Sequence, residues 1–375
     1  MRHQKRGDFY ILGIILCAAL LGAIACSKTI EESPRETKQS VSSKPAEPKP
    51  AVSETIEKKP SSPVSAEVMK ACEPFVPPWG SGSWTEWGQN NPEEGEKWYG
   101  SVEETMTGAD LTVLPKCTHL ENLFVGFSSL TDLSPLAGLS NLKRLDLRMI
   151  GKLEDLTPIA KLPKLEYLNI TGTNVQDFSP LTELPALAEI EARMLKMTDA
   201  APIAKMSALE KIDLLKTPIT DVTPMASAAK LAHILICTTQ VEDVTPLIPV
   251  QKRIRSLDVC GTKFSDFKQL GKFEHLTMLR LTKMPIQDLG VIAGLEKMEK
   301  LDIGGTKVTD LSPIRKMTEM RELDISELEL KDLSPLHRMK KLTKLYMVNS
   351  KVSAKQLEAL KKAVPTVEIT TDWGV

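Results

Sequence analysis

Among the side chains that can take part in acid–base chemistry, aspartate recurs most regularly in this chain, at intervals of 22 or 23 residues. The series is Asp132, Asp155, Asp177, Asp199, Asp221, Asp243, Asp266, Asp288, Asp310 and Asp332. Neighbouring carboxylates can share acid and base roles in catalysis. However, most of these aspartates lie in similar strings, such as Asp310-Leu311-Ser312-Pro313, whose composition is typical of a turn. The spacing therefore indicates a repeated structural unit, and no catalytic residue is predicted.

No other arrangement of residues indicates an enzyme. His119, His233, His275 and His337 lie in different repeats without an obvious shared partner. The chain lacks a phosphate-binding Gly-rich loop ending in Lys-Ser/Thr, a His-Glu-x-x-His motif and a Gly-x-Ser-x-Gly motif. No Cys/His spacing predicts zinc. The formal net charge of −1 gives no indication of nucleic acid binding. We therefore predict a non-enzymatic protein with no cofactor, no metal and no nucleic acid partner.

The N-terminus is typical of an export signal. A basic start precedes an uncharged apolar tract over residues 9–25, which is short for a membrane-spanning helix of about 20 residues. The tract ends in Ala23-Ile24-Ala25-Cys26, which resembles the lipobox of bacterial lipoproteins, with Ala23 where that family usually has Leu. The resemblance implies lipid attachment at Cys26 and a cell-envelope location, outer membrane rather than inner because Ser27 is not Asp. Ordinary signal cleavage and an uncleaved anchor are the alternatives.

Four further cysteines, Cys72, Cys117, Cys237 and Cys260, would lie in an oxidising compartment if the chain is exported. Cys72 and Cys117 flank an N-terminal segment, and we predict a disulfide that clamps this segment to the first repeat. Cys237 and Cys260 occupy the same position in adjacent repeats, about 4.8 Å apart if both lie on strands. Equivalent side chains of parallel strands point the same way, so the sequence slightly favours two free thiols there.

Each repeat carries an L-x-x-L-x-L frame, as in Leu165, Leu168 and Ile170. The alternation predicts a short strand with its apolar residues inward. A Ser or Thr before a Pro follows in seven repeats, and we expect the Ser or Thr to be a helix N-cap and the Pro the first helical residue. The period thus predicts an α/β solenoid, a stack of strand, turn and short helical segment.

These repeats resemble the short 22-residue leucine-rich repeats of internalins and of the leucine-rich protein phosphatase regulatory subunit. The resemblance covers residues 110–369. It implies a horseshoe with a parallel β-sheet on the concave face and short helical or 3-10 turns on the convex face. The predicted segments are a signal peptide (1–25), a disordered Ser/Pro/Lys/Glu-rich tether (26–66), a Trp-rich N-terminal cap (67–109), the leucine-rich-repeat array (110–350) and a C-terminal cap (351–375).

Both ends of a solenoid need a cap over their apolar edges. At the C-terminus, Ser353 and Gln356 have the spacing of a helix capping box, and residues 367–369 are compatible with a last strand. At the N-terminus, Trp79, Trp84, Trp87, Trp98 and Tyr99 lie among loop-forming residues. We favour a small aromatic core for this cluster over a surface that stacks on sugars.

The outward strand positions form a candidate binding face whose acidic ridge is interrupted by apolar residues near its centre. The candidate residues are Lys211, Asp213, Leu215, His233, Leu235, Cys237, Asp258, Cys260, Met278 and Arg280. In the competing interpretation each Asp simply recurs with the repeat and is solvated. We predict an envelope lipoprotein that is anchored to the lipid bilayer through acylated Cys26 and binds a protein partner for adhesion, scaffolding or regulation. Binding of glycan or peptidoglycan by the Trp-rich segment is the alternative.

Overall fold

The computed structural model describes residues 66–75 and 111–372. Cys26, the predicted signal peptide, nearly all of the predicted tether and the cluster of tryptophans lie outside these residues. Within the described ranges, no helix has the length and apolar character needed to cross a membrane.

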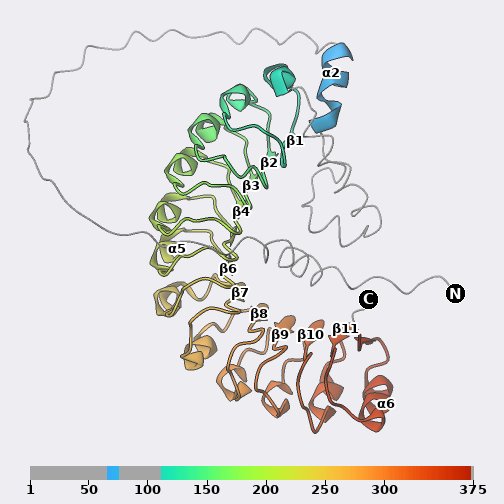
Figure 1. Cartoon of the computed structure of the whole chain (residues 1–375). Helices are drawn as coiled ribbons and strands as arrows, with labels where there is room; N and C mark the ends of the chain where they lie inside the picture. Colours follow the sequence, from blue (N-terminus) through green and yellow to red (C-terminus); the bar gives the residue numbers. More distant parts are fainter. Residues whose placement is uncertain (1–65, 76–110, 373–375) are drawn as a thin grey trace, which may run out of the picture.

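A single sheet of twelve parallel strands runs through the described chain, and the strands follow one another in sequence order. Each strand has three residues. They are β1 Asn122–Phe124, β2 Arg144–Asp146, β3 Tyr167–Asn169, β4 Glu189–Glu191, β5 Lys211–Asp213, β6 His233–Leu235, β7 Ser256–Asp258, β8 Met278–Arg280, β9 Lys300–Asp302, β10 Glu322–Asp324, β11 Lys344–Tyr346 and β12 Glu368–Thr370. The sheet lines the inner side of an arc (Figure 1), which confirms the predicted solenoid.

Short helical segments return the chain from each strand to the next along the outer side of the arc (Figure 1). Most are 3-10 helices, a type of helix that occurs in short segments and therefore suits a tight repeat. They are η2 Leu111–Lys116, η3 Ser134–Leu136, η4 Thr157–Lys161, η5 Ser179–Glu183, η6 Ala201–Lys205, α5 Thr223–Ser227, η7 Thr245–Val250, η8 Phe267–Lys272, η9 Leu289–Ile292, η10 Ser312–Ile314 and η11 Ser334–Arg338. The convex face therefore has the 3-10 turns that the resemblance implies.

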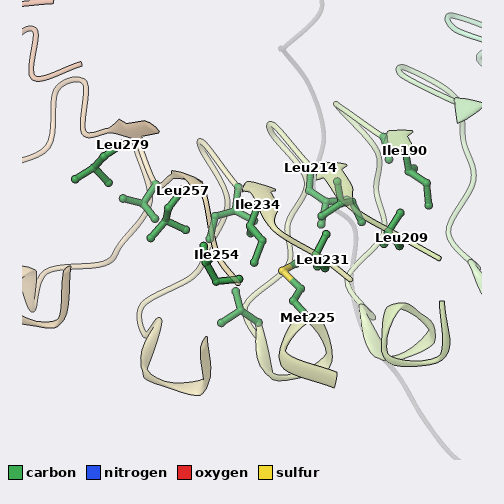
Figure 2. Close-up of a cluster of buried hydrophobic side chains, with 14 of the residues drawn as sticks. Ile190, Leu209, Leu214, Met225, Leu231, Ile234, Ile254, Leu257 and Leu279 are labelled. Carbon is green, nitrogen blue, oxygen red and sulfur yellow. The ribbon is translucent and has the colours of Figure 1, made fainter. Parts of the chain in front are cut away.

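The apolar residues of the frame fill the space between the sheet and the helical segments. Figure 2 shows this core around β4 to β8, where Leu214, Ile234 and Leu257 meet residues of the outer turns such as Met225. All four side chains are fully buried. Each repeat contacts mainly its neighbours, so the core is a continuous column and not one central cluster.

The recurring aspartates build the turn that leads into each helical segment. Asp132 Oδ1 accepts a hydrogen bond from the backbone N–H of Ser134 at 2.8 Å. The same contact, to the N–H two residues ahead, is made by Asp155, Asp177, Asp199, Asp221, Asp243, Asp288, Asp310 and Asp332. Asp266 differs and accepts from the side chain of Gln269. The turn role predicted for most of these residues is thus confirmed.

The predicted N-cap role of Ser or Thr is wrong. Ser134 is already the first residue of η3, Leu133 precedes it as the cap, and no side chain caps the segment. The reason is that Asp132, two residues earlier, already takes the N–H of Ser134. The hydroxyls have other partners: Ser312 Oγ, for example, donates to Asp310.

Both ends of the array are covered. Helix α2 (Ala66–Cys72) and the 3-10 turn η1 (Glu73–Phe75) lie at the N-terminal end, where a disulfide joins Cys72 to Cys117 with 5.9 Å between the Cα atoms. At the C-terminal end, α6 (Ala354–Ala363) begins with the predicted capping box of Ser353 and Gln356. Strand β12 then pairs with β11 and extends the sheet.

Candidate functional site

The ten candidate binding residues lie together in four adjacent repeats, either on strands β5 to β8 or two residues after a strand. The strand register aligns Lys211, His233, Ser256 and Met278 in one column and Asp213, Leu235, Asp258 and Arg280 in the next. Leu215, Cys237 and Cys260 each follow two residues after the second column, and so form a third. We call this surface the central face.

The carboxylates of the central face are buried and paired with arginines. Asp213 is 3% exposed and accepts from Arg193 Nε at 2.7 Å. Asp258 is 1% exposed and accepts from Arg280 Nη1 at 2.9 Å, while Arg280 Nε lies 3.3 Å from Asp302. The interpretation in which each Asp is solvated is therefore wrong for Asp213 and Asp258. Arg193 and Asp302 belong to the site but were not among the predicted residues.

Arg193 and Asp302 were difficult to predict because each pairs with a residue one strand away. Arg193 and Asp213 are 20 residues apart in the chain. The signal that could identify Arg193 is its basic side chain two positions after the middle column, in the repeat that precedes Asp213. This signal does not identify Asp302, because the equivalent position holds Thr282, whose Oγ1 donates to Asp302 Oδ2 at 2.7 Å.

Burial also changes the proton affinity of this carboxylate row. Desolvation raises the pKa of Asp258 to about 6, against the lowering effect of Arg280. Desolvation, followed by repulsion from Asp302, raises the pKa of Asp324 to about 6. The pKa of Asp302 is also raised by desolvation. The neighbouring strands thus hold several carboxylates around one shared arginine, Arg280.

These shifts predict a maximum of stability at mildly acidic pH. A carboxyl with a pKa raised in the folded state contributes stability at low pH that is lost as pH rises through the folded value. We expect the free energy of unfolding to increase by about 1–3 kcal/mol between pH 7.5 and pH 5. Below about pH 4 the trend reverses, because hydrogen bonds from Ser134 and Ser179 lower the pKa values of Asp132 and Asp177.

Urea unfolding across pH measures this dependence, and Asp258→Asn should flatten it above pH 5. An unchanged slope in that variant would contradict the assignment to Asp258.

The centre of the face is less polar than its surroundings. Leu215, Leu235 and Met278 are partly exposed, whereas most large apolar side chains of the described residues are buried. Beside them, His233 Nδ1 lies 2.7 Å from Ser256 Oγ, and burial lowers the pKa of His233. A neutral imidazole that is hydrogen-bonded to Ser256 therefore borders the apolar centre.

A disulfide joins Cys237 to Cys260 next to this centre, with 4.6 Å between the Cα atoms. The sequence slightly favoured two thiols, and the structure differs because the in-register pairing of β6 with β7 brings equivalent positions side by side. The two sulfurs and a carboxylate oxygen of Asp258 lie within 4.8 Å of one another. Since metals bind thiolates and these sulfurs are oxidised, we assign no metal to this group.

The turn after each strand has a left-handed backbone. Thr238, directly after Cys237, has φ of 59°, and the equivalent residues of other repeats, such as Lys216 (57°) and Gly261 (59°), share this conformation. The left-handed region is least favourable for a β-branched residue such as Thr238. Because the conformation recurs along the array, it belongs to the repeat and does not mark the central face.

Comparison with known proteins identifies the fold class. No protein-family model and no curated protein matches the chain. Among solved structures, an internalin from Listeria monocytogenes is 26% identical with a TM-score of 0.57, and the match covers 70% of this chain and 76% of that one. A leucine-rich-repeat protein from Leptospira interrogans is 18% identical with a TM-score of 0.54, covering 69% and 74%. The chain is therefore a leucine-rich-repeat protein, and internalins are among its structural neighbours.

Proposed function

We propose that this leucine-rich-repeat protein is a non-enzymatic recognition protein that binds a protein partner through the central face. The observation that carries the proposal is the partly exposed apolar group of Leu215, Leu235 and Met278, beside the ion pairs of Asp213 with Arg193 and of Asp258 with Arg280. Apolar anchors surrounded by polar groups are typical of the energetic centre of a protein interface.

The polar surroundings of that centre are already fixed before a partner arrives. Arg193 is held by Asp213, and Arg280 by Asp258 and Asp302. Side chains that are ordered in the free protein lose little conformational entropy on binding. The short strands of a continuous sheet add a rigid backbone. Preformed complementarity is therefore the mechanism we propose for recognition.

The proposal includes an anchor in the bacterial cell envelope, facing the periplasm or the cell surface. Cys26 would carry the lipid, with the outer membrane as the favoured location because Ser27 follows it. Expression with a radiolabelled fatty acid tests this part separately: the wild-type protein should be labelled and Cys26→Ala should not. Equal labelling of both proteins would contradict the anchor without affecting the binding proposal.

Crosslinking in the native envelope followed by mass spectrometry should recover a protein joined to residues of β5 to β8. With that partner, Leu235→Asp should weaken binding about 30-fold, because a charge would replace a central apolar anchor. Met149→Asp is a matched control, since Met149 is 42% exposed and lies outside the central face. Unchanged affinity in a folded Leu235→Asp protein contradicts the proposal. Crosslinks to glycan within residues 67–109 would favour the alternative partner.

A further inference from the structure

One flank of the arc is strongly basic at its C-terminal end. This flank consists of the segments that lead from η10, η11 and α6 to the next strand, together with the last turn of each of these helical segments. We call it the basic flank. Its acid is Glu319, and His337 is partly exposed. Its basic side chains are all exposed, and they are Arg315, Lys316, Arg321, Arg338, Lys340, Lys341, Lys361 and Lys362.

The opposite flank of the same repeats has no such excess of positive charge. It consists of the segments that lead from β9, β10 and β11 to the next helical segment. Its charged residues are Lys307, Lys331, Lys351, Asp310, Glu327, Glu329 and Asp332. Acids thus slightly outnumber lysines there, so the positive charge of these repeats is concentrated on one side of the array.

Hydrogen bonds and ion pairs join the basic flank across successive coils. Lys341 Nζ lies 2.5 Å from Glu319 Oε2 of the preceding repeat. Lys340 Nζ donates to the carbonyl oxygen of Ala363, at the end of α6, at 2.6 Å. The basic residues therefore form one continuous surface at the end of the array where β11 and α6 lie (Figure 1).

Four side chains of the basic flank form neither an ion pair nor a side-chain hydrogen bond with the described residues. They are Arg315, Arg338, Lys361 and Lys362. Half of the eight basic charges are offset by acids in and beside the flank, which are Glu296, Glu299, Glu319 and Glu358. The flank keeps a net charge of +4, whereas the whole chain has −1. Repulsion between like charges opposes folding, so the stability of the array does not explain this excess.

We propose that the basic flank lies against the anionic headgroups of a phospholipid membrane. This inference goes beyond the proposed function, because it concerns a different surface and a different partner. Each Lys or Arg close to an anionic bilayer strengthens association about fivefold. The attraction acts over about 8 Å at physiological ionic strength. One flat surface can approach all the unpaired basic side chains, because they lie on one side of the array.

A membrane fits this flank better than a nucleic acid does. Proteins that bind single strands present aromatic side chains on which bases stack, and the basic flank contains no Phe, Tyr or Trp. Its apolar residues Met317, Met320 and Met339 are buried, so the contact would be electrostatic and confined to the headgroups. The proposed anchor at Cys26 lies about 40 residues before α2, and a tether of that kind raises the local concentration of the membrane. A weak contact is then enough to orient the array.

This orientation would leave the central face accessible. The sheet lines the inner side of the arc (Figure 1), and the two flanks lie on either side of it. With the basic flank against the bilayer, the concave face points along the membrane surface. A protein partner could therefore reach β5 to β8 without displacing the array from the lipid.

Energy transfer from a dye on the protein to headgroup-labelled lipid tests this inference. Full-length protein with Cys17→Ser and Cys26→Ser is made by cell-free synthesis under oxidising conditions and incorporated into vesicles, where the apolar tract of residues 9–25 holds it without an acyl chain. The other four cysteines are disulfide-bonded, so a dye can be placed on Thr318→Cys, an exposed site of the basic flank. Thr309→Cys, exposed on the opposite flank, is the matched control site.

Transfer from position 318 should be at least about twofold higher in vesicles with about one third phosphatidylglycerol than in phosphatidylcholine vesicles. Raising the salt from about 0.1 M to about 1 M should remove the difference, because the Debye length falls to about 3 Å. Transfer from position 309 should not rise. Equal transfer from position 318 in both lipids, or an equal rise from both positions, overturns the inference.

A variant that removes the four unpaired charges gives the second test. Arg315→Gln/Arg338→Gln/Lys361→Gln/Lys362→Gln should lower transfer from position 318 to its level in phosphatidylcholine. The control Lys152→Gln/Lys196→Gln/Lys307→Gln/Lys331→Gln removes as many exposed charges outside the basic flank and should behave as wild type. If circular dichroism shows that the first variant is unfolded, Arg315→Gln/Arg338→Gln leaves α6 intact and should lower the transfer in part.

Two further results would overturn the inference. Equal losses in the variant and its control would mean that total charge, and not the basic flank, attracts the protein to the lipid. Heparin is a soluble polyanion that tests the other class of partner. If the variant loses binding to heparin while its transfer to anionic lipid is unchanged, the flank binds a polyanion and not a membrane.

Discussion

The double variant Cys72→Ala/Cys117→Ala should lose about 4 kcal/mol of unfolding free energy, from the loop-closure entropy of a crosslink. The bond spans 45 residues of sequence, and both cysteines are fully buried. It ties the end of α2 to the residue that follows η2, next to Phe75 and Leu114 of the core. Without it, the apolar edge of the first repeat should open more easily, since terminal repeats have a neighbour on one side only.

Urea unfolding followed by circular dichroism measures this loss. The oxidised wild type, the wild type in a dithiol reductant and the double variant should be compared at one pH. The reduced wild type should resemble the double variant. Because the central face lies several repeats away, the affinity of this variant for a partner should be unchanged. Equal unfolding midpoints for the oxidised wild type and the double variant would show that the disulfide contributes nothing.

The fold could be predicted from the sequence because one signal repeats many times. Each unit shows the same apolar frame, so a departure from the frame in one copy does not change the prediction. The register follows as well, since strands of equal length separated by equal turns must align. The turn role of the aspartates was also predictable from their position before Ser-Pro.

The prediction failed where two residues compete for one group. Ser134 and Asp132 can each cap the start of η3, and only the geometry shows that the Asp side chain takes the N–H of Ser134. The same limit applies to the disulfide of Cys237 and Cys260, where the sequence predicts proximity and the structure determines the bond. The partner of the Ser134 N–H and the state of the two cysteines both depend on small differences in atomic position, which a residue pattern does not specify.

The sequence predicts which residues of the candidate site lie in each column of the sheet, but it does not predict the ion pairs that connect them. Alternation identified Asp213, Asp258 and Arg280 as outward residues, and the strand register brings them together. Their burial depends on arginines of other strands, as for Asp213 and Arg193. Such details arise from packing between repeats, so the period predicts the scaffold and the departures from it define the surface.

Leu257→Ala should be destabilising by about 3 kcal/mol, since it leaves a cavity in a fully buried site. Leu257 lies at the middle of β7, is 0% exposed and is paired in register with Ile234 on β6 and Leu279 on β8. Figure 2 shows the three side chains in one layer of the core. Because each repeat of a solenoid contacts only its neighbours, the loss should be concentrated in β6 to β8.

This local loss has a functional consequence that distinguishes it from general destabilisation. The weakened strands carry or adjoin four residues of the central face, namely Leu235, Cys260, Met278 and Arg280. Hydrogen exchange should therefore accelerate there first, and partner binding should weaken. Leu345→Ala on β11 is the matched control, since Leu345 is 1% exposed and holds the equivalent position. It should cost a similar free energy, accelerate exchange near the C-terminal cap and leave binding intact. Uniform acceleration along the whole array in both variants would mean that the solenoid unfolds as one unit. The stability of the central face could not then be changed separately from that of the other repeats.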